Sequence, residues 1–124
     1  MKIRAYYEDT DAGGIVYHAN YLKYCERARS EIFFERGLSP AIGDAQFVVV
    51  NINADFKVSA KLGDMLNVTT VLKSHKRSSL VLAQEVFRDG ELLFRMDVTL
   101  VFVEGTKPKR LTGDVLELFT VDKP

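Results

Sequence analysis

One long amphipathic segment near the N-terminus dominates the organisation of this chain. From about position 18 or 20 to 36, apolar residues recur at positions 21, 24, 25, 28 and 32, which is the spacing of one helix face. Asn20 is a candidate N-cap and Gly37 a candidate C′ residue. Phe33 and Phe34 widen the apolar surface beyond a single stripe. A helix with so much apolar surface is expected to be wrapped by other elements rather than docked on one side.

The remainder of the chain has the patterning of strands. Four runs follow the helix, at positions 47–58, 65–76, 79–88 and 91–104, and Asp89-Gly90 between the last two is a strong hairpin signal. In the last run the even positions 92–102 are apolar, whereas positions 95, 97 and 99 are polar, which predicts a sheet with one buried side. Residues 2–8 alternate like a short strand, and residues 114–119 fit a short terminal helix.

The order of these elements predicts the fold class. Short connections favour an antiparallel meander, because parallel strands need crossover helices. We therefore expect an α+β fold in which an antiparallel sheet of about five strands is wrapped round one long central helix. With 124 residues, positions 1–124 are expected to form a single domain with a proper core.

Charge and cysteine content exclude several classes of function. Seventeen basic side chains balance seventeen acidic ones, so a whole-surface attraction to nucleic acid or anionic lipid is unsupported. The single cysteine fits a reducing compartment. The N-terminus has no apolar signal core, and no run approaches the roughly 18 apolar residues of a transmembrane segment. These features predict a cytoplasmic location.

An acidic, glycine-rich loop precedes the predicted helix, and three interpretations compete. It reads Asp9-Thr10-Asp11-Ala12-Gly13-Gly14. Asp and Gly are turn residues, so a turn in which one carboxylate caps the helix is the simplest interpretation. A calcium loop is excluded, because positions five and twelve are Gly13 and Asn20 where carboxylates are needed.

Catalysis is the third interpretation. Thioester hydrolysis needs a group that attacks the carbonyl or activates water, together with donors for the oxyanion. Asp11 can supply the first, and unpaired N–H groups around Tyr17 and His18 at the helix start can supply the second. The residues alone leave this choice open.

A family resemblance favours catalysis. Residues 6–22 read Tyr-Tyr-Glu-Asp-Thr-Asp-Ala-Gly-Gly-Ile-Val-Tyr-His-Ala-Asn-Tyr-Leu, and Ala-Lys-Leu-Gly-Asp stands at 60–64. These strings resemble the Tol-Pal-associated acyl-CoA thioesterases, within the hotdog-fold group that includes 4-hydroxybenzoyl-CoA thioesterase. The resemblance implies a hotdog fold, a sheet wrapped round a long helix.

The resemblance also implies roles for particular residues. Asp11 would be the catalytic carboxylate, either as nucleophile or as general base for water. The backbone N–H near His18 would polarise the thioester carbonyl, and the side chains of Tyr7 and His18 would orient Asp11 or the substrate. Asp9 is expected to stabilise the loop.

Substrate-binding candidates lie in and around two turns. The polar segment 74–79 is either a solvated turn or a clamp for coenzyme A phosphates, for which the resemblance favours Arg77 and Ser78 over His75. Further candidates are Tyr17, Lys57, Ser59 and Lys61. Relatives often carry proline where this chain has Ser59.

Other reactive residues have simpler interpretations. Cys25 lies on the apolar helix face and is expected to be a small core residue rather than a nucleophile. Glu26 and Glu31 read as a charged helix face, with a secondary role for Glu31 as the alternative. The helix aromatics default to core or acyl-pocket lining; they are Tyr17, Tyr21, Tyr24, Phe33 and Phe34.

The function that the resemblance implies is hydrolysis of an acyl-CoA thioester to free acid and coenzyme A. No cofactor and no metal are implied, since coenzyme A is part of the substrate, and acyl carrier protein is an alternative acyl donor. A homo-oligomer is implied, a tetramer built as a dimer of dimers with the pocket between protomers. The alternatives are a hydratase or dehydratase on the same fold, and a non-catalytic acyl-thioester-binding or envelope-associated scaffold module.

Overall fold

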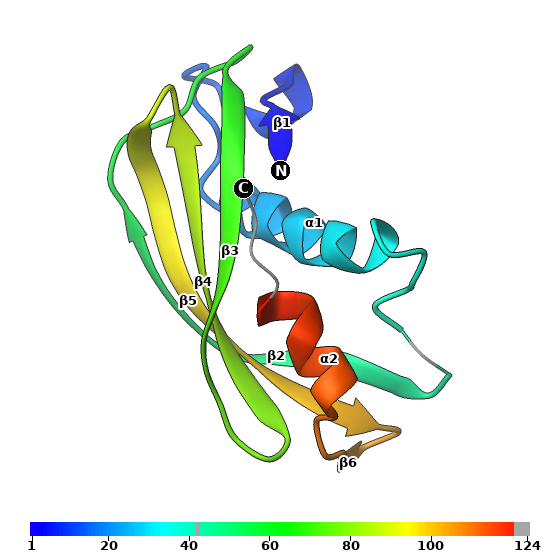
Figure 1. Ribbon diagram of the computed structural model, residues 1–124. Coiled ribbons are helices and arrows are strands. Elements are labelled where there is room, and N and C mark those ends of the chain that lie inside the picture. The colour runs from blue at the N-terminus through cyan, green and yellow to red at the C-terminus, as the bar shows by residue number, and fades with distance from the viewer. Residues whose placement is uncertain (42, 121–124) are drawn as a thin grey trace.

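The computed structural model describes residues 1–41 and 43–120. Within these residues, two helices, a short 3-10 turn and six strands follow one another (Figure 1). In order they are β1 (Lys2–Arg4), the 3-10 turn η1 (Tyr7–Asp9), α1 (Asn20–Phe34), β2 (Ala45–Phe56), β3 (Met65–His75), β4 (Ser79–Arg88), β5 (Glu91–Glu104), β6 (Lys107–Pro108) and α2 (Gly113–Thr120).

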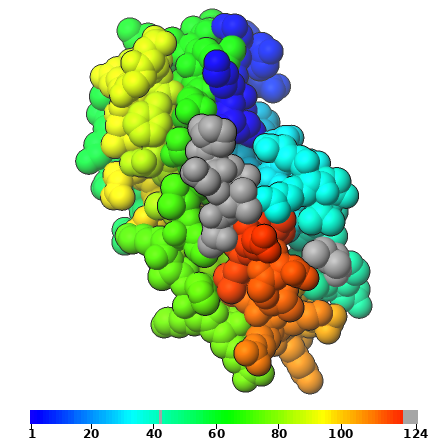
Figure 2. Space-filling view, in the orientation of Figure 1, coloured from blue at the N-terminus to red at the C-terminus, as the bar shows by residue number. Residues whose placement is uncertain are grey.

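The strands form one antiparallel sheet that curls beside α1. Its order is β1-β3-β4-β5-β2, and the two-residue strand β6 pairs with β5. Figure 1 shows the sheet curving round one side of α1, with α2 on the same concave side. α1 stays visible at the molecular surface in the space-filling view (Figure 2), so the sheet wraps it only in part. The predicted α+β architecture is confirmed.

The β4–β5 hairpin agrees closely with its sequence pattern. Asp89 and Gly90 have φ angles of 49° and 82°, as a tight hairpin turn requires. The inner face of β5 is buried at positions 94, 96, 98, 100 and 102. Leu92 was expected on this face but is only half-buried. Phe87 pairs with Leu92 and Val86 pairs with Phe94. Leu93 therefore lies between these pairs as the extra residue of a bulge, and it is buried in place of Leu92.

The N-terminal segment differs from the prediction. A strand was expected over residues 2–8, but β1 ends at Arg4 and η1 follows. The side chain of Asp9 accepts a hydrogen bond from the Tyr6 N–H at 2.9 Å, which closes the chain into a turn. The aspartate therefore ends the strand early.

The prediction for the start of α1 was wrong, whereas the prediction for its end is confirmed. Asn20 is the first helical residue rather than the N-cap, since its side chain bonds to Asp9 and not to the helix. Gly37 behaves as expected. It has φ of 70°, its N–H donates to the Phe34 carbonyl, and the Leu38 N–H donates to the Phe33 carbonyl, which is a Schellman ending.

The core lies between the helices and the inner sheet face. α1 contributes a buried face that includes Tyr21, Tyr24, Cys25 and Phe33. Tyr17 and Phe34 were expected to be core or pocket residues, but both are about half exposed. The predicted single domain spans positions 1–124; positions 42 and 121–124 lie outside the described residues, and this boundary stays a prediction.

Candidate active site

A cavity of about 230 Å³ lies where the acidic loop, the start of α1 and the end of β2 meet. It brings together four of the predicted site residues, Asp11, His18, Lys57 and Ser59. The other lining residues are Ile15, Val16, Tyr21, Phe56 and Val58.

The loop holds Asp11 in a fixed turn at this cavity. Its backbone N–H donates to the Ile15 carbonyl at 2.9 Å, and its carboxylate oxygen Oδ1 accepts from the Gly13 N–H at 2.8 Å. Gly14 completes the turn with φ of 79°, a conformation in which a side chain would be strained. The other oxygen, Oδ2, accepts no hydrogen bond from the described part of the chain, so it is available for chemistry.

The same loop is docked onto the segment that follows β2. The Val16 N–H donates to the Ala60 carbonyl at 2.8 Å, and the Leu62 N–H donates to the Gly14 carbonyl at 3.2 Å. The Ala60 N–H in turn donates to the Tyr21 hydroxyl at 3.0 Å. Segment 60–64, part of the family resemblance, therefore supports the acidic loop.

An ion pair secures the end of that segment. The Asp64 carboxylate accepts from the Arg88 guanidinium and from the Lys61 N–H, both at 2.8 Å. Partial burial opposes the charge, but these donors hold the pKa of Asp64 below its usual value. The turn is thus tied to the end of β4.

Asp9 anchors the loop from inside. It is only 4% exposed, and its carboxylate accepts from the Tyr6 N–H and from the Asn20 side-chain amide, each at 2.9 Å. Its carbonyl accepts from the Tyr17 N–H at 2.8 Å. Asp9 therefore joins η1 to the first residue of α1, and the carboxylate does not cap α1 itself.

The buried phenol of Tyr24 lies near this anchor. Burial first, and the Asp9 carboxylate second, raise the pKa of Tyr24. Its hydroxyl is nevertheless not in hydrogen-bonding geometry with Asp9 or with any other group of the described residues.

The helix start offers fewer free donors than expected. The Tyr17 N–H is not an oxyanion donor, because it already donates to the Asp9 carbonyl. The His18 and Ala19 N–H groups have no acceptor in the described part of the chain. The His18 ring packs against Tyr17, with ring centroids 4.4 Å apart, and lies 6.1 Å from the Phe56 ring. Of the two positions expected to donate, only His18 still can.

Other predicted residues lie outside the cavity, and their roles stay predictions. Tyr7 is 82% exposed on η1, and Tyr17 is also exposed. Lys61 pairs with Ile15 in an isolated bridge beside the cavity without lining it. Arg77 and Ser78 lie in the β3–β4 turn, at the end of β3 opposite to the acidic loop (Figure 1).

Sequence reasoning missed the apolar wall of the cavity. Phe56 and Val58 line it from the end of β2 and beyond, and Ile15 lines it from the loop. All three are partly exposed apolar side chains, and a strand pattern alone cannot separate such positions from core. Tyr21 does line the cavity, and burial raises its pKa.

Cys25 and the glutamates of α1 lie away from this chemistry. Cys25 is fully buried, which raises the pKa of its thiol to about 12 and confirms it as a core residue. Glu26 and Glu31 are exposed and do not line the Asp11 cavity. Over residues 1–41 and 43–120, no three His, Cys, Asp or Glu side chains gather closely enough to hold a metal ion. In the same ranges, neither helix has the length and apolar character needed to cross a membrane.

A curled antiparallel sheet around one long helix, with a carboxylate loop directly before that helix, defines a hotdog-fold protein. The thioesterase superfamily matches residues 13–94, and the chain belongs to this family. The predicted hotdog fold and the predicted family are both confirmed.

Two relatives that are named as thioesterases agree with this assignment. The acyl-CoA thioesterase YbgC of Helicobacter pylori is 51% identical over 87 residues, which cover 70% of this chain and 65% of that protein. The acyl-CoA thioester hydrolase YbgC of Escherichia coli is 39% identical over 111 residues, which cover 86% of this chain and 83% of that protein. The chain thus spans about two-thirds of the length of the Helicobacter relative.

A solved structure supports the fold. The probable thioesterase from Bartonella henselae superposes with a TM-score of 0.84 at 29% identity, over 90% of this chain and 97% of that one.

Proposed function

We propose that this protein hydrolyses acyl-CoA thioesters to a free acid and coenzyme A. The observation that carries the proposal is the Asp11 carboxylate, held by the Gly13 N–H at a cavity whose rim also includes His18. The family and the functions named for the Helicobacter and Escherichia relatives support the same reaction.

Asp11 acts in one of two ways. As a nucleophile, it attacks the thioester carbonyl carbon, the C–S bond breaks, and the mixed anhydride is then hydrolysed by water. As a general base, it takes a proton from water while the oxygen of that water attacks the same carbon. In both cases the coenzyme A thiolate leaves and is protonated, and Asp11 ends as a carboxylate. Thiolate is a good leaving group, so neither route needs a metal or a cofactor.

In this proposal the backbone N–H of His18 donates a hydrogen bond to the carbonyl oxygen of the thioester. Charge that develops on this oxygen is stabilised by a donor that has no competing acceptor, and the N-terminus of α1 adds its partial positive charge. The exposed side chains of His18 and Tyr7 are assigned to orient Asp11 or the substrate.

Coenzyme A is assigned to basic and polar groups beside the cavity. Lys57 and Ser59 line it, and Lys61 lies next to it. Arg77 and Ser78 lie at the far end of the sheet, so within this proposal they contact coenzyme A bound to a second copy of the chain.

The exposed edge of the sheet supports the proposal that the protein is a homo-oligomer. β2 is an edge strand, and its exposed apolar side chains are Val48, Val49, Val50, Ile52 and Phe56. Unpaired edges of this length are normally covered. We propose that two copies of the chain contact each other through β2 to form a dimer. Two such dimers would form a tetramer, and the proposed location of the protein is the cytoplasm.

The test is thiol release by the wild-type protein from a panel of short, long and aromatic acyl-CoAs, and from acyl carrier protein thioesters. The proposal expects steady thiol release from at least one member of the panel. Turnover of a 2-enoyl thioester without thiol release would instead indicate a hydratase. Tight binding of acyl-CoA with no turnover of any kind would indicate a scaffold module.

A further inference from the structure

One wall of the Asp11 cavity is a segment that belongs to no helix or strand. It consists of Lys57, Val58 and Ser59, which directly follow β2. The Lys57 and Val58 N–H groups both donate to the Leu93 carbonyl, at 2.8 and 3.1 Å. The Ser59 N–H has no acceptor in the described part of the chain. The position of Ser59 therefore depends on other contacts.

The Arg88 guanidinium, at the end of β4, supplies those contacts. Its nitrogen Nη1 donates to the Asp64 carboxylate at 2.8 Å and lies 3.4 Å from the Ser59 carbonyl oxygen. Its nitrogen Nη2 donates to the Glu91 carboxylate at 2.9 Å, across the β4–β5 hairpin turn. A single guanidinium therefore joins both ends of segment 59–64 to the hairpin.

The arrangement suits arginine and not lysine. A guanidinium presents several donors in a rigid plane, whereas an ammonium is a compact point charge that cannot keep the same geometry at three acceptors. Only 22% of the Arg88 side chain and 23% of the Asp64 side chain is exposed, so water and salt screen this pair less than a fully exposed ion pair.

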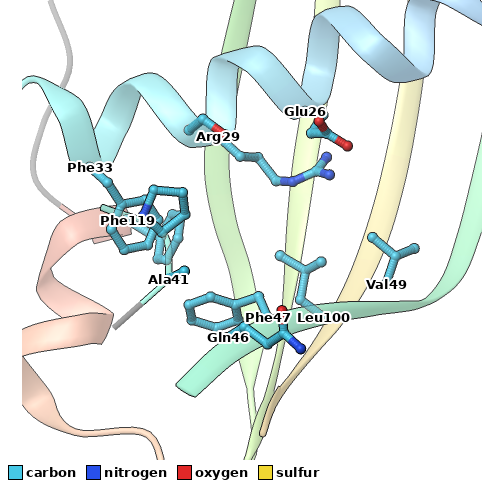
Figure 3. A pocket seen from close by; sticks show the side chains of 11 residues that line it. Glu26, Arg29, Phe33, Ala41, Gln46, Phe47, Val49, Leu100 and Phe119 are labelled. Carbon is cyan, nitrogen blue, oxygen red and sulfur yellow. The ribbon is translucent and has the colours of Figure 1, made fainter. Parts of the chain in front are cut away.

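Arg88 does not contact the cavities themselves. It lines neither the Asp11 cavity nor a second cavity, of about 260 Å³, between α1, β2 and α2. Figure 3 shows that Arg29 is the arginine that reaches across this second cavity. Arg88 can therefore influence the Asp11 cavity only through the groups that it holds.

The acidic loop is positioned without help from Arg88. The Asp11 carboxylate accepts from the Gly13 N–H within the loop itself. The loop also docks on Ala60, and the Tyr21 hydroxyl holds the Ala60 N–H. The part of the cavity that depends on Arg88 is thus the wall that ends at Ser59.

We propose that Arg88 is a positioning residue for the binding of coenzyme A. It fixes Ser59 in the wall that also carries Lys57, and these two side chains are assigned to coenzyme A. The inference rests on the proposed thioesterase function. Because Asp11 is held separately, Arg88 should affect KM and leave kcat nearly unchanged.

The test compares thiol release by Arg88→Lys and Arg88→Gln with that of the wild type. We expect KM for acyl-CoA to rise about fivefold or more in both variants, with kcat within about twofold. Asp64→Asn, which leaves the Arg88 charge in place, should raise KM by a similar factor. Combining Arg88→Gln with Asp64→Asn should raise it no further, because both changes break the same contact.

Two controls accompany these variants. Arg95→Gln removes an arginine from a surface ion pair with Asp55 and should leave KM and kcat unchanged. Calorimetric binding of coenzyme A, which needs no turnover, should weaken in the Arg88 variants by the same factor as KM rises. Arg88→Lys keeps the charge, so it remains informative if Arg88→Gln fails to fold.

The possible outcomes separate this inference from the proposed function. Unchanged KM and unchanged coenzyme A affinity in Arg88→Lys would overturn the inference and leave thioester hydrolysis standing. A rise in KM that Asp64→Asn does not reproduce would also overturn it, because Arg88 would then contact the substrate directly. Coenzyme A binding that depends on Arg88, in a wild type that releases no thiol, would support the inference and overturn the proposed function.

Discussion

Asp9 and Asn20 decide how the acidic loop meets α1. Both are buried, and each satisfies the other through the 2.9 Å bond between the Asn20 amide and the Asp9 carboxylate. A buried carboxylate that loses a donor keeps its desolvation cost. The acidic loop therefore depends on a pair that takes no part in the proposed reaction.

Asn20→Ala should lower the free energy of unfolding by about 1.5–3 kcal/mol, the usual worth of a hydrogen bond to a charged group. Asn20→Asp should lower the free energy of unfolding further than Asn20→Ala does, because it places a second carboxylate against Asp9. This is expected although aspartate resembles asparagine in shape more closely than alanine does. Urea denaturation at neutral pH measures both. If Asn20→Asp were the milder change, the bond between the Asn20 amide and the Asp9 carboxylate would not be what holds the loop to α1.

Removing the hydroxyl of Tyr24 and removing that of Tyr21 should change the stability of the protein differently. The Tyr24 hydroxyl is buried without a hydrogen-bond partner among the described residues, so Tyr24→Phe should be neutral or stabilising. Tyr21→Phe removes the acceptor of the buried Ala60 N–H and should cost about 1–3 kcal/mol. Thermal unfolding of the two variants side by side tests this. A clear loss of stability in Tyr24→Phe would mean that its hydroxyl bonds to Asp9 after all.

At the scale of elements, the sequence predicted the bounds of those strands that are determined by neighbouring residues in the chain. β4 and β5 were placed at their observed bounds because their side chains alternate and Asp89-Gly90 joins them. The start of α1 and the end of β1 were misjudged, because each depends on the Asp9 side chain bonding to groups that only the folded chain brings near.

The candidate site divides in the same way. Asp11 and His18 were found because they belong to one continuous motif, whereas Phe56 and Val58 reach the cavity through sheet pairing. The occupied N–H of Tyr17 could not be foreseen either, since its acceptor is the carbonyl of Asp9, eight positions earlier.

The Schellman ending of α1 gives a prediction for one element. Gly37→Ala should destabilise the protein by about 1 kcal/mol, because Ala is strained at φ of 70°. Gly113→Ala is the matched control. It opens α2 without a positive φ and has open space for a methyl group, so it should be neutral or stabilising. Equal losses in the two variants, measured by urea denaturation, would contradict this account of the helix end.

At the scale of the whole molecule, β2 is the element whose exposed apolar side chains are hardest to explain in a monomer. Val50 is 56% exposed and is the unpaired residue of a bulge, since Val49 pairs with Leu100 and Asn51 with Thr99. An apolar bulge on a long edge strand is better explained by a covering copy than by solvent.

Val50→Lys should therefore break the proposed dimer without unfolding the chain. Light scattering should give a multiple of 14.0 kDa for the wild type and a smaller mass for the variant, with unchanged circular dichroism. Val71→Lys on β3, which is equally exposed, is the matched control and should leave the dimer intact. A monomeric wild type would exclude the dimer contact.

In the proposed reaction, Asp11 is the group that performs thioester hydrolysis. The decisive measurement is kcat/KM for thiol release by Asp11→Asn, beside Glu8→Gln, which removes an exposed charge from the same loop region. We predict a loss of about a hundredfold or more in the folded Asp11 variant and little change in the Glu8 variant. A folded Asp11→Asn protein that releases thiol at the wild-type rate would contradict the claim.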